Sequence, residues 1–170
     1  MGVTLWMAMS LNGMTARPDG AEDFLSNADW EMFVDLVRGS DALVWGRVTH
    51  ELFEELIRPY AVDQPIVAVT GDAGYATGPG SLRASSPEDA VEMLRARGVD
   101  KILLAGGSAL NGAFIQAGLV DEVVLGIEPV IVARGLPLLR GDAPDLRLQL
   151  ADVQRVSDQT LLVRYRVRRT

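Results

Sequence analysis

The chain has 170 residues, of which 48% are hydrophobic and 23% charged, a balance typical of one globular domain and unlike that of a disordered chain. Its formal net charge of −7 would repel a polyanion, so we expect no nucleic-acid partner. It contains no cysteine and a single histidine, His50, which excludes disulfides, cysteine nucleophiles and two-histidine metal sites. We therefore expect one domain over residues 1–170 that holds no metal.

The chain opens on a short apolar run, Val3 to Met9, that follows no basic leader and is too short to span a membrane. We expect a cytoplasmic protein without a membrane partner. The run predicts a buried strand over residues 3–10 that ends in an Asn12-Gly13 turn. Residues 15–24, which contain several turn formers, are expected to form an irregular loop near the end of this strand.

Helical and strand patterns alternate along the rest of the chain. Apolar residues at helical spacing predict helices over residues 28–38, 49–57, 87–97 and 108–117, the last two of which are closed by Gly98 and Gly118. Apolar runs between breakers predict strands over residues 41–46, 65–70, 101–105, 120–132 (interrupted near Pro129), 146–156 and 161–167.

Residues 71–85 separate two of these elements and are expected to be a long loop. The last two strands, around Ser157-Asp158-Gln159, are expected to form an antiparallel pair. The order of the elements predicts an α/β fold with a mixed sheet, helices on both faces and a hairpin at the C-terminal edge.

Two adjacent glycines link a predicted strand to a predicted helix at Gly106-Gly107-Ser108. Glycine lets the backbone approach a ligand closely, and the free N–H groups and dipole of a helix N-terminus favour an anion. The segment therefore suits a phosphate or pyrophosphate. A tight turn without a ligand accounts for two adjacent glycines equally well.

A second strand-to-helix turn, Gly46-Arg47-Val48-Thr49, offers a guanidinium and a hydroxyl. Arg47 suits a terminal phosphate in a bidentate contact, to which Thr49 adds its hydroxyl; a surface arginine on a helix cap is the alternative. Neither turn matches the Rossmann or P-loop pattern. An open α/β sheet would bring both turns to the carboxyl ends of its strands, where a dinucleotide with a pyrophosphate and a 2′-phosphate would use both.

Four segments of the chain, in a fixed order, carry a resemblance to a known family. They are Met9-Ser-Leu-Asn-Gly13, Asp41-Ala-Leu-Val-Trp-Gly-Arg-Val-Thr49, Gly106-Gly-Ser-Ala-Leu-Asn111 and Gly118-Leu-Val-Asp-Glu122, followed by Pro129 and Gly135-Leu-Pro-Leu. Together they resemble the riboflavin-biosynthesis reductase and dihydrofolate reductase superfamily over nearly the whole chain. The resemblance implies a dihydrofolate-reductase-like three-layer fold with a mostly parallel central sheet. It also implies a homodimer, because the riboflavin branch commonly pairs.

The activity that the resemblance implies is NADPH-dependent transfer of a hydride to a C=N bond of a pterin- or pyrimidine-like heterocycle. It assigns the pyrophosphate to the glycine pair and its helix, at Gly106, Gly107, Ser108, Ala109 and Leu110. It assigns further phosphate contacts to Gly46, Arg47 and Thr49, and the adenosine half to Thr70. The nicotinamide end falls to Ala8, Thr15 and Ala16.

The acid singled out by the resemblance is Asp29. In dihydrofolate reductases a carboxylate early in the helix after the first loop grips the pterin, with an aromatic residue four positions later, and Asp29 with Phe33 has that spacing. A buried carboxyl there would also suit proton donation, with water as the other source. Ser26-Asn-Ala-Asp29 equally fits a capping box, in which Asp29 would only close the helix end.

The chain also departs from the riboflavin reductases. They usually show Ser-Leu-Asp-Gly-Lys at the first strand, where this chain has Asn12 and Met14 on the substrate side, and their Asp-Asp-Pro stretch is replaced here by Thr49-His-Glu-Leu-Phe53. These differences argue against the usual phosphoribosylamino-pyrimidine as the substrate. The alternative function is a non-catalytic nucleotide-binding module with the same fold.

Overall fold

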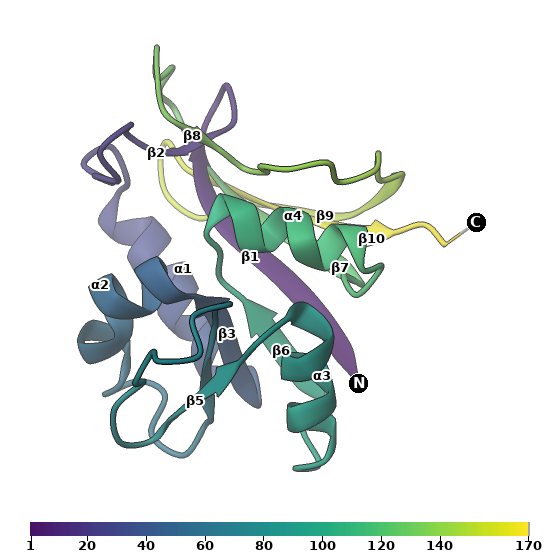
Figure 1. Ribbon diagram of the computed structural model, residues 1–170. Helices are drawn as coiled ribbons and strands as arrows, with labels where there is room; N and C mark the ends of the chain where they lie inside the picture. Colours follow the sequence, from purple (N-terminus) through teal and green to yellow (C-terminus); the bar gives the residue numbers. More distant parts are fainter. Residues whose placement is uncertain (170) are drawn as a thin grey trace.

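An eight-stranded sheet runs through the centre of the computed structural model, which describes residues 1–169 (Figure 1). Its strands are β1 (Gly2–Ser10), β3 (Ala42–Gly46), β4 (Ile66–Val69), β5 (Ser81–Ala84), β6 (Lys101–Leu104), β7 (Glu122–Glu128), β9 (Leu148–Arg155) and β10 (Leu161–Val167). The helices are α1 (Asn27–Arg38), α2 (Arg47–Ile57), α3 (Pro87–Arg95) and α4 (Ser108–Gln116). A two-stranded sheet joins β2 (Met14–Ala16) to β8 (Leu136–Pro137).

The strand order is β5-β4-β3-β6-β1-β7-β10-β9. The strands from β5 to β7 in this order run parallel, whereas β10 is antiparallel to both β7 and β9. The carboxyl ends of β1, β3, β4 and β6 therefore meet at one edge of the sheet, where ligands bind in open α/β folds.

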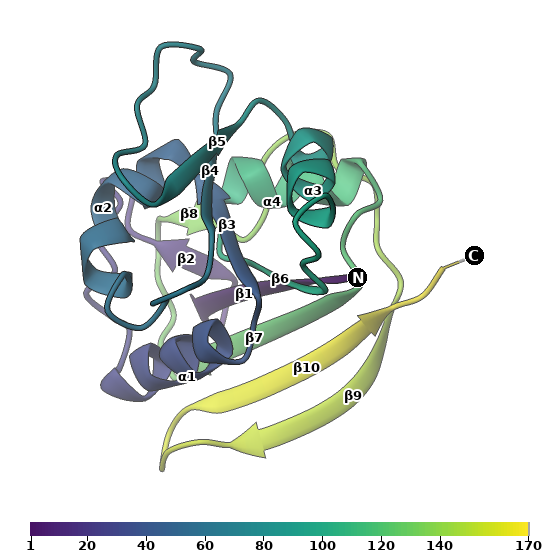
Figure 2. The ribbon, with the colours of Figure 1, turned by 90° about the horizontal axis from the view of Figure 1, so that it is seen from below.

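The sheet has a hydrophobic core on each face because side chains alternate along its strands. In β3, for example, Val44 packs with α3 and α4 on one face, while Leu43 and Trp45 pack with α1 and α2 on the other. Strands covered on both faces read as continuous apolar runs, as in the Ile-Val-Ala-Val sequence of β4. Figure 2 shows the two helix pairs on opposite sides of the sheet. The predicted three-layer α/β fold with a mostly parallel sheet is confirmed.

Several details differ from the sequence prediction. The expected loop over 71–85 contains strand β5 near its end. The expected loop over 15–24 overlaps strand β2 at its first two residues. Helix α2 begins at Arg47, two residues earlier than expected, and β7 ends at Glu128, before Pro129. Strands β5 and β8 lack a continuous buried apolar run, so no hydrophobic pattern marks them.

None of the helices in the described part of the chain is both long and apolar enough to cross a membrane.

Candidate active site

The two glycine-containing turns adjoin at the carboxyl edge of the sheet. Strands β3 and β6, which lead into them, are parallel neighbours. The Gly46 N–H donates a 2.7 Å hydrogen bond to the Gly106 carbonyl. A Cβ atom on Gly107 would lie 3.6 Å from Thr49 Oγ1. One ligand can therefore contact both turns.

The helices that start at these turns have open N-termini. Within residues 1–169, α2 begins after Gly46 and α4 after Gly107, and neither first turn receives a hydrogen bond from a capping side chain. By contrast, Ser26 caps α1 and Ser86 caps α3. The first N–H groups of α2 and α4 are thus available to an anionic ligand, which the helix dipole favours.

A groove of about 580 Å³ runs along both turns. Many of the residues named from the sequence line it, namely Thr15, Ala16, Gly46, Arg47, Thr49, Gly107, Ser108, Ala109 and Leu110. Gly106 lies behind the lining with φ at +82°, and a Cβ atom there would come within 2.9 Å of Met7 Sδ, so this position requires glycine.

Two other residues named from the sequence lie outside this groove. Ala8 lines the neighbouring pocket instead. Thr70 lies just beyond the groove residue Val69, and its hydroxyl accepts a hydrogen bond from the Asp72 N–H at 3.1 Å.

The groove also contains residues that sequence reasoning missed. Arg140 reaches it from the segment after β8, where its N–H donates to the Ser108 carbonyl at 3.0 Å. Ser85 and Ser86 line it from the start of α3. Arg140 lies in an irregular segment without periodicity, so no sequence signal could have placed it beside α4. Arg140 and Arg47 give the groove two guanidinium groups suited to phosphate.

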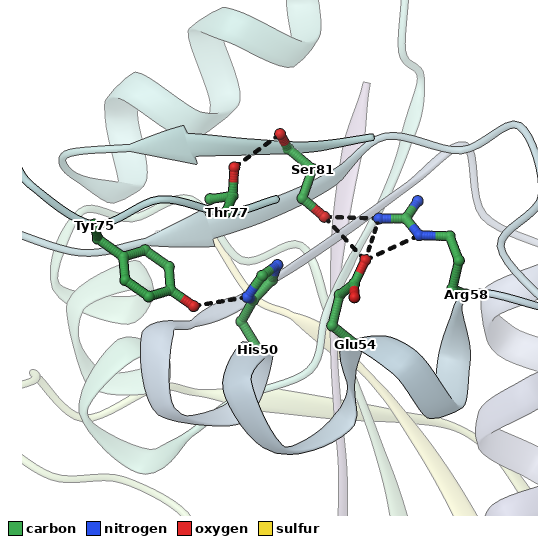
Figure 3. A network of polar contacts seen from close by, with 6 residues as sticks. All are labelled: His50, Glu54, Arg58, Tyr75, Thr77 and Ser81. Carbon is green, nitrogen blue, oxygen red and sulfur yellow. Dashed lines mark hydrogen bonds and ion pairs between the residues drawn. The ribbon is translucent and has the colours of Figure 1, made fainter. Parts of the chain in front are cut away.

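Arg47 is held in place without being buried. Its guanidinium forms a 3.3 Å ion pair with Glu51 and lies over the Tyr75 ring, and the side chain is 45% exposed. The Tyr75 hydroxyl in turn bonds to His50 Nδ1 at 2.8 Å (Figure 3). Further along α2, Glu54 accepts a hydrogen bond from Ser81 in β5, and Arg58, which follows the last residue of the helix, bonds to both Ser81 and Glu54. This network fixes the 71–80 loop against the helix that carries Arg47.

A second, largely aromatic pocket of about 250 Å³ adjoins the groove. Its walls include Trp6, Ala8, Trp30, Phe33, Trp45 and Phe53, with the carboxyl groups of Glu22 and Asp29. The pocket and the groove share lining residues, among them Met7, Glu22 and Thr49. The two cavities therefore form one continuous site.

Asp29 lies against the floor of this pocket and is only 2% exposed. It does not form a capping box: the Asp29 N–H bonds to Ser26 Oγ at 3.4 Å, but the Ser26 N–H donates to Glu128 Oε1 at 3.0 Å rather than to Asp29. Its carboxyl is close to β7, where a Cβ atom on Gly126 would come within 2.1 Å of Asp29 Oδ1. The capping-box explanation of this carboxyl is therefore wrong, and the absence of a side chain at Gly126 makes room for it.

The surroundings of the Asp29 carboxyl favour its protonated form at neutral pH. Among the described residues neither of its oxygens has a hydrogen-bond partner, and the carboxyl groups of Glu128 and Glu22 act on it. Burial first, and then the neighbouring carboxyl groups of Glu128 and Glu22, raise the pKa of Asp29 to about 8. Burial likewise raises the pKa of Glu22 to about 7.

Glu128 is the ionised member of the pair. Burial by itself would raise the pKa of Glu128, but hydrogen bonds from Ser26 and Thr160, together with the neighbouring Asp29 carboxyl, outweigh it and lower that pKa below its ordinary value. Sequence reasoning missed Glu128 because it occupies an ordinary position at the end of a strand. The two neighbouring carboxyl groups thus have pKa values shifted in opposite directions, so that Asp29 is the one that favours the protonated form and Glu128 the one that favours the ionised form.

Asn12 and Phe33, the other expected substrate ligands, lie differently. Phe33 lines the aromatic pocket, four residues from Asp29 as the spacing indicated. The Asn12 amide bonds to the backbone of Val132 at 2.9 and 3.0 Å and to Ser10 Oγ at 2.8 Å. Asn12 therefore ties the turn after β1 to the segment after β7.

The sheet order and the groove at its carboxyl edge define a dihydrofolate-reductase-like α/β protein. Comparison with protein families is more specific: the model of the RibD C-terminal domain matches residues 2–162, and the chain belongs to this family. Its relatives include the uncharacterized protein YwjB of Bacillus subtilis (strain 168), 27% identical over 152 residues that make up 86% of this chain and 87% of that protein.

Two solved structures illustrate the shared fold. A protein assigned to riboflavin biosynthesis from Shewanella sp. PV-4 superposes with a TM-score of 0.82 at 21% identity, over 99% of this chain and 100% of that one. The diaminohydroxyphosphoribosylaminopyrimidine deaminase/5-amino-6-(5-phosphoribosylamino)uracil reductase of Thermotoga maritima superposes with a TM-score of 0.76 at 19% identity. That match covers 98% of this chain but 56% of the Thermotoga chain.

Proposed function

We propose that this protein is an NADPH-dependent reductase that acts on a C=N bond of a pterin- or pyrimidine-like heterocycle. The observation that carries the proposal is the continuity of two cavities, one suited to phosphates and the other aromatic and bordered by a protonated acid. A dinucleotide in the groove would extend its reactive ring toward a planar substrate in the pocket, and such alignment is the protein's main contribution in enzymes of this kind.

The groove has the groups that NADPH requires. The open N-terminus of α4 at Gly107 to Leu110 suits the pyrophosphate, and Arg47 with Thr49 at the start of α2 suits a further phosphate. Arg140 adds a second guanidinium. Ala8 lines the pocket, and Thr15 and Ala16 line the adjoining groove, which suits the nicotinamide. The adenosine contact of Thr70 stays a prediction.

NADPH, when bound, supplies a hydride to the carbon of the C=N bond and leaves as NADP⁺. The nitrogen must then gain one proton, so each turnover consumes one NADPH and one proton. Asp29 carries a proton at neutral pH beside the pocket, which suits it to supply that proton directly or through water. The aromatic walls, including Trp30 and Phe33, hold the ring and exclude bulk water.

The test is NADPH oxidation by the purified protein with dihydrofolate, dihydropterins and ribosylamino-pyrimidines. We expect turnover with at least one of them, a strongly reduced rate in Asp29→Asn, and a raised KM for NADPH in Arg47→Ala. Arg38→Ala is the matched control, because Arg38 also pairs with an acid on its own helix and lies over a tyrosine ring. Binding of NADPH without turnover on any heterocycle would instead indicate a nucleotide-binding module.

We further propose that the protein is a homodimer paired through the β9–β10 hairpin. All residues of β9 are exposed, and the hairpin forms the edge of the sheet (Figure 2). The pairing of β9 with β10 contains a bulge between Leu150 and Asp152. As a result, Leu148, Leu150 and Val153 share one face of the hairpin, where they are the cross-strand partners of Val167, Tyr165 and Val163. An apolar stripe on an edge hairpin suits a second copy of itself. Light scattering during gel filtration measures the mass of the protein in solution, and the proposal predicts the mass of two chains.

A further inference from the structure

The loop over residues 71–80 is mostly exposed, but one of its side chains is anchored on helix α2. The Tyr75 hydroxyl bonds to His50 Nδ1 at 2.8 Å, and the two rings meet edge to face with their centroids 5.8 Å apart (Figure 3). The chain is held again just after the loop, where Ser81 bonds to the end of α2. These contacts fix the Tyr75 ring beside the helix.

His50 is a rigid anchor for this ring. It is only 5% exposed, and its imidazole packs edge to face against the fully buried Trp45 of β3, with 6.0 Å between the ring centroids. Burial also lowers the pKa of His50, so the imidazole is neutral at neutral pH. The bond between His50 and Tyr75 therefore joins two uncharged groups, one of which is embedded in the core.

Tyr75 and one acid together determine where the Arg47 guanidinium lies. The guanidinium carbon of Arg47 is 5.9 Å from the centroid of the Tyr75 ring, which is within cation–π distance. Its Nη1 bonds to Glu51, one turn further along α2, at 3.3 Å. The Arg47 side chain is 45% exposed, and a long exposed side chain has many rotamers to lose when it is ordered. These two contacts restrict that freedom before any ligand binds.

The contact with Tyr75 leaves Arg47 able to bind a phosphate. A cation–π contact requires the charge to lie over the ring but occupies no hydrogen-bond donor, whereas a phosphate accepts hydrogen bonds from the guanidinium N–H groups. Arg47 lines the groove together with Gly46 and Thr49. The Tyr75 ring therefore holds Arg47 at the groove without using the donors that a phosphate needs.

We propose that Tyr75, anchored by His50, is a positioning residue that gives this reductase a preference for NADPH over NADH. The inference rests on the proposed function, which assigns Arg47 to a phosphate other than the pyrophosphate; in NADPH that group is the 2′-phosphate. NADH lacks it. A change that releases Arg47 therefore weakens the binding of NADPH and leaves the binding of NADH nearly unchanged.

The measurement is the ratio of the dissociation constants of NADH and NADPH, obtained by calorimetric titration of one preparation of each variant. Tyr75→Leu removes the ring and is expected to lower this ratio at least about five-fold, because Arg47 loses a cation–π contact and must be ordered by the ligand. Tyr75→Phe keeps the ring but loses the hydroxyl, and is expected to lower the ratio at least about two-fold. An unchanged ratio in either variant overturns the inference.

The matched control is Tyr60→Leu. The Tyr60 ring lies under Arg38 in the same way, with 5.3 Å from the guanidinium carbon to the ring centroid, and neither residue lines the groove. This variant is expected to keep the wild-type ratio. A loss as large as that in Tyr75→Leu would show that the ratio responds to any lost tyrosine, which overturns the role of Tyr75.

Two variants of His50 test the anchor. His50→Asn keeps a polar group near the position of Nδ1, whereas His50→Leu removes it. We expect His50→Asn to retain more of the NADPH preference than His50→Leu. Equal losses in the two variants would show that only the packing of His50 matters, which overturns the role of its bond to Tyr75.

A double variant distinguishes positioning from direct contact. In Arg47→Ala, the further change Tyr75→Leu is expected to leave the ratio unaltered, because Tyr75 acts through the guanidinium. A further loss as large as in the wild-type background would give Tyr75 its own contact with the cofactor and overturn the positioning role. Failure of the wild type to bind NADPH is the separate result that removes the proposed function.

Discussion

Replacement of Asp29 by asparagine is expected to stabilise the protein at neutral and alkaline pH. The ionised form of Asp29 is unfavourable in the folded chain because the side chain is 2% exposed and faces Glu128 and Glu22. Asparagine has nearly the same shape, keeps an N–H donor for Glu128 and does not titrate. The variant therefore removes a cost of folding while it preserves the packing.

The size of the effect follows from the pKa of Asp29, which rises from 3.8 to about 8 on folding. For an acid whose pKa is raised, the folded state binds more protons than the unfolded state between these values, so stability falls as pH rises through them. A pH of 7 is about three units above the unfolded pKa of Asp29. At 1.36 kcal/mol per unit, the free-energy cost that Asp29 adds to folding at this pH is at most about 4 kcal/mol. The cost is near zero around pH 4 and levels off above about pH 8.

Guanidinium denaturation of the wild type and Asp29→Asn across this pH range measures the difference. The account predicts that the variant gains stability relative to the wild type as pH rises. Asp35→Asn, at an exposed position of the same helix, is expected to change stability by less than about 1 kcal/mol throughout. If Asp29→Asn is less stable than the wild type at pH 8, the carboxyl is ionised and favourably bound, and the assignment of its proton is wrong.

Three further predictions concern the site and the assembly. Arg47→Ala is expected to raise the KM for NADPH by about ten-fold or more, because it removes a charged hydrogen bond worth about 1.5–3 kcal/mol. The KM for NADH should rise less. Initial rates measure both constants, and an unchanged KM for NADPH would contradict a phosphate contact by Arg47. Gly126→Ala is expected to lower kcat at least ten-fold, because the new Cβ would come within 2.1 Å of Asp29 Oδ1, and an unchanged kcat would show that the carboxyl position is irrelevant. Leu150→Glu is expected to yield a monomer on gel filtration, and a dimer that survives it does not use the hairpin stripe.

The pH dependence of catalysis follows from the same proton. The kcat is expected to fall as pH rises above about 8, because Asp29 then loses the proton that it supplies. This alkaline limb should be absent from the residual rate of Asp29→Asn. An alkaline limb that persists in the variant would assign it to another group.

Much of the fold could be predicted from the sequence because the buried strands are continuous apolar runs and the helices show apolar residues at helical spacing, some of them with start and stop signals. Ser86-Pro87 and the stop at Gly98 bracket α3 in this way. Strand β5 could not be found by pattern, since its Ser-Leu-Arg-Ala sequence is mostly half-buried at the sheet edge. It is defined by pairing with β4, which is a property of the fold and not of the segment.

The site was predictable where a residue type leaves a mark in the local sequence. Glycines that begin α2 and α4 signal close backbone approach, and the turns they form do adjoin. The carboxyl partner of Asp29 left no such mark: Glu128 is far away in sequence and meets Asp29 only because α1 packs beside β7. Arg140 was missed for the same reason, because its position depends on the path of an irregular segment past α4.

Energy transfer from tryptophan to bound NADPH tests the central proposal most directly, because the three tryptophans line the pocket toward which the nicotinamide would point. With excitation of tryptophan, titration with NADPH is predicted to quench protein emission and to produce saturable nicotinamide emission. The midpoint should move to higher concentration in Arg47→Ala but not in Arg38→Ala. Absence of energy transfer at millimolar NADPH, or transfer that is unaffected by Arg47→Ala, would contradict the account.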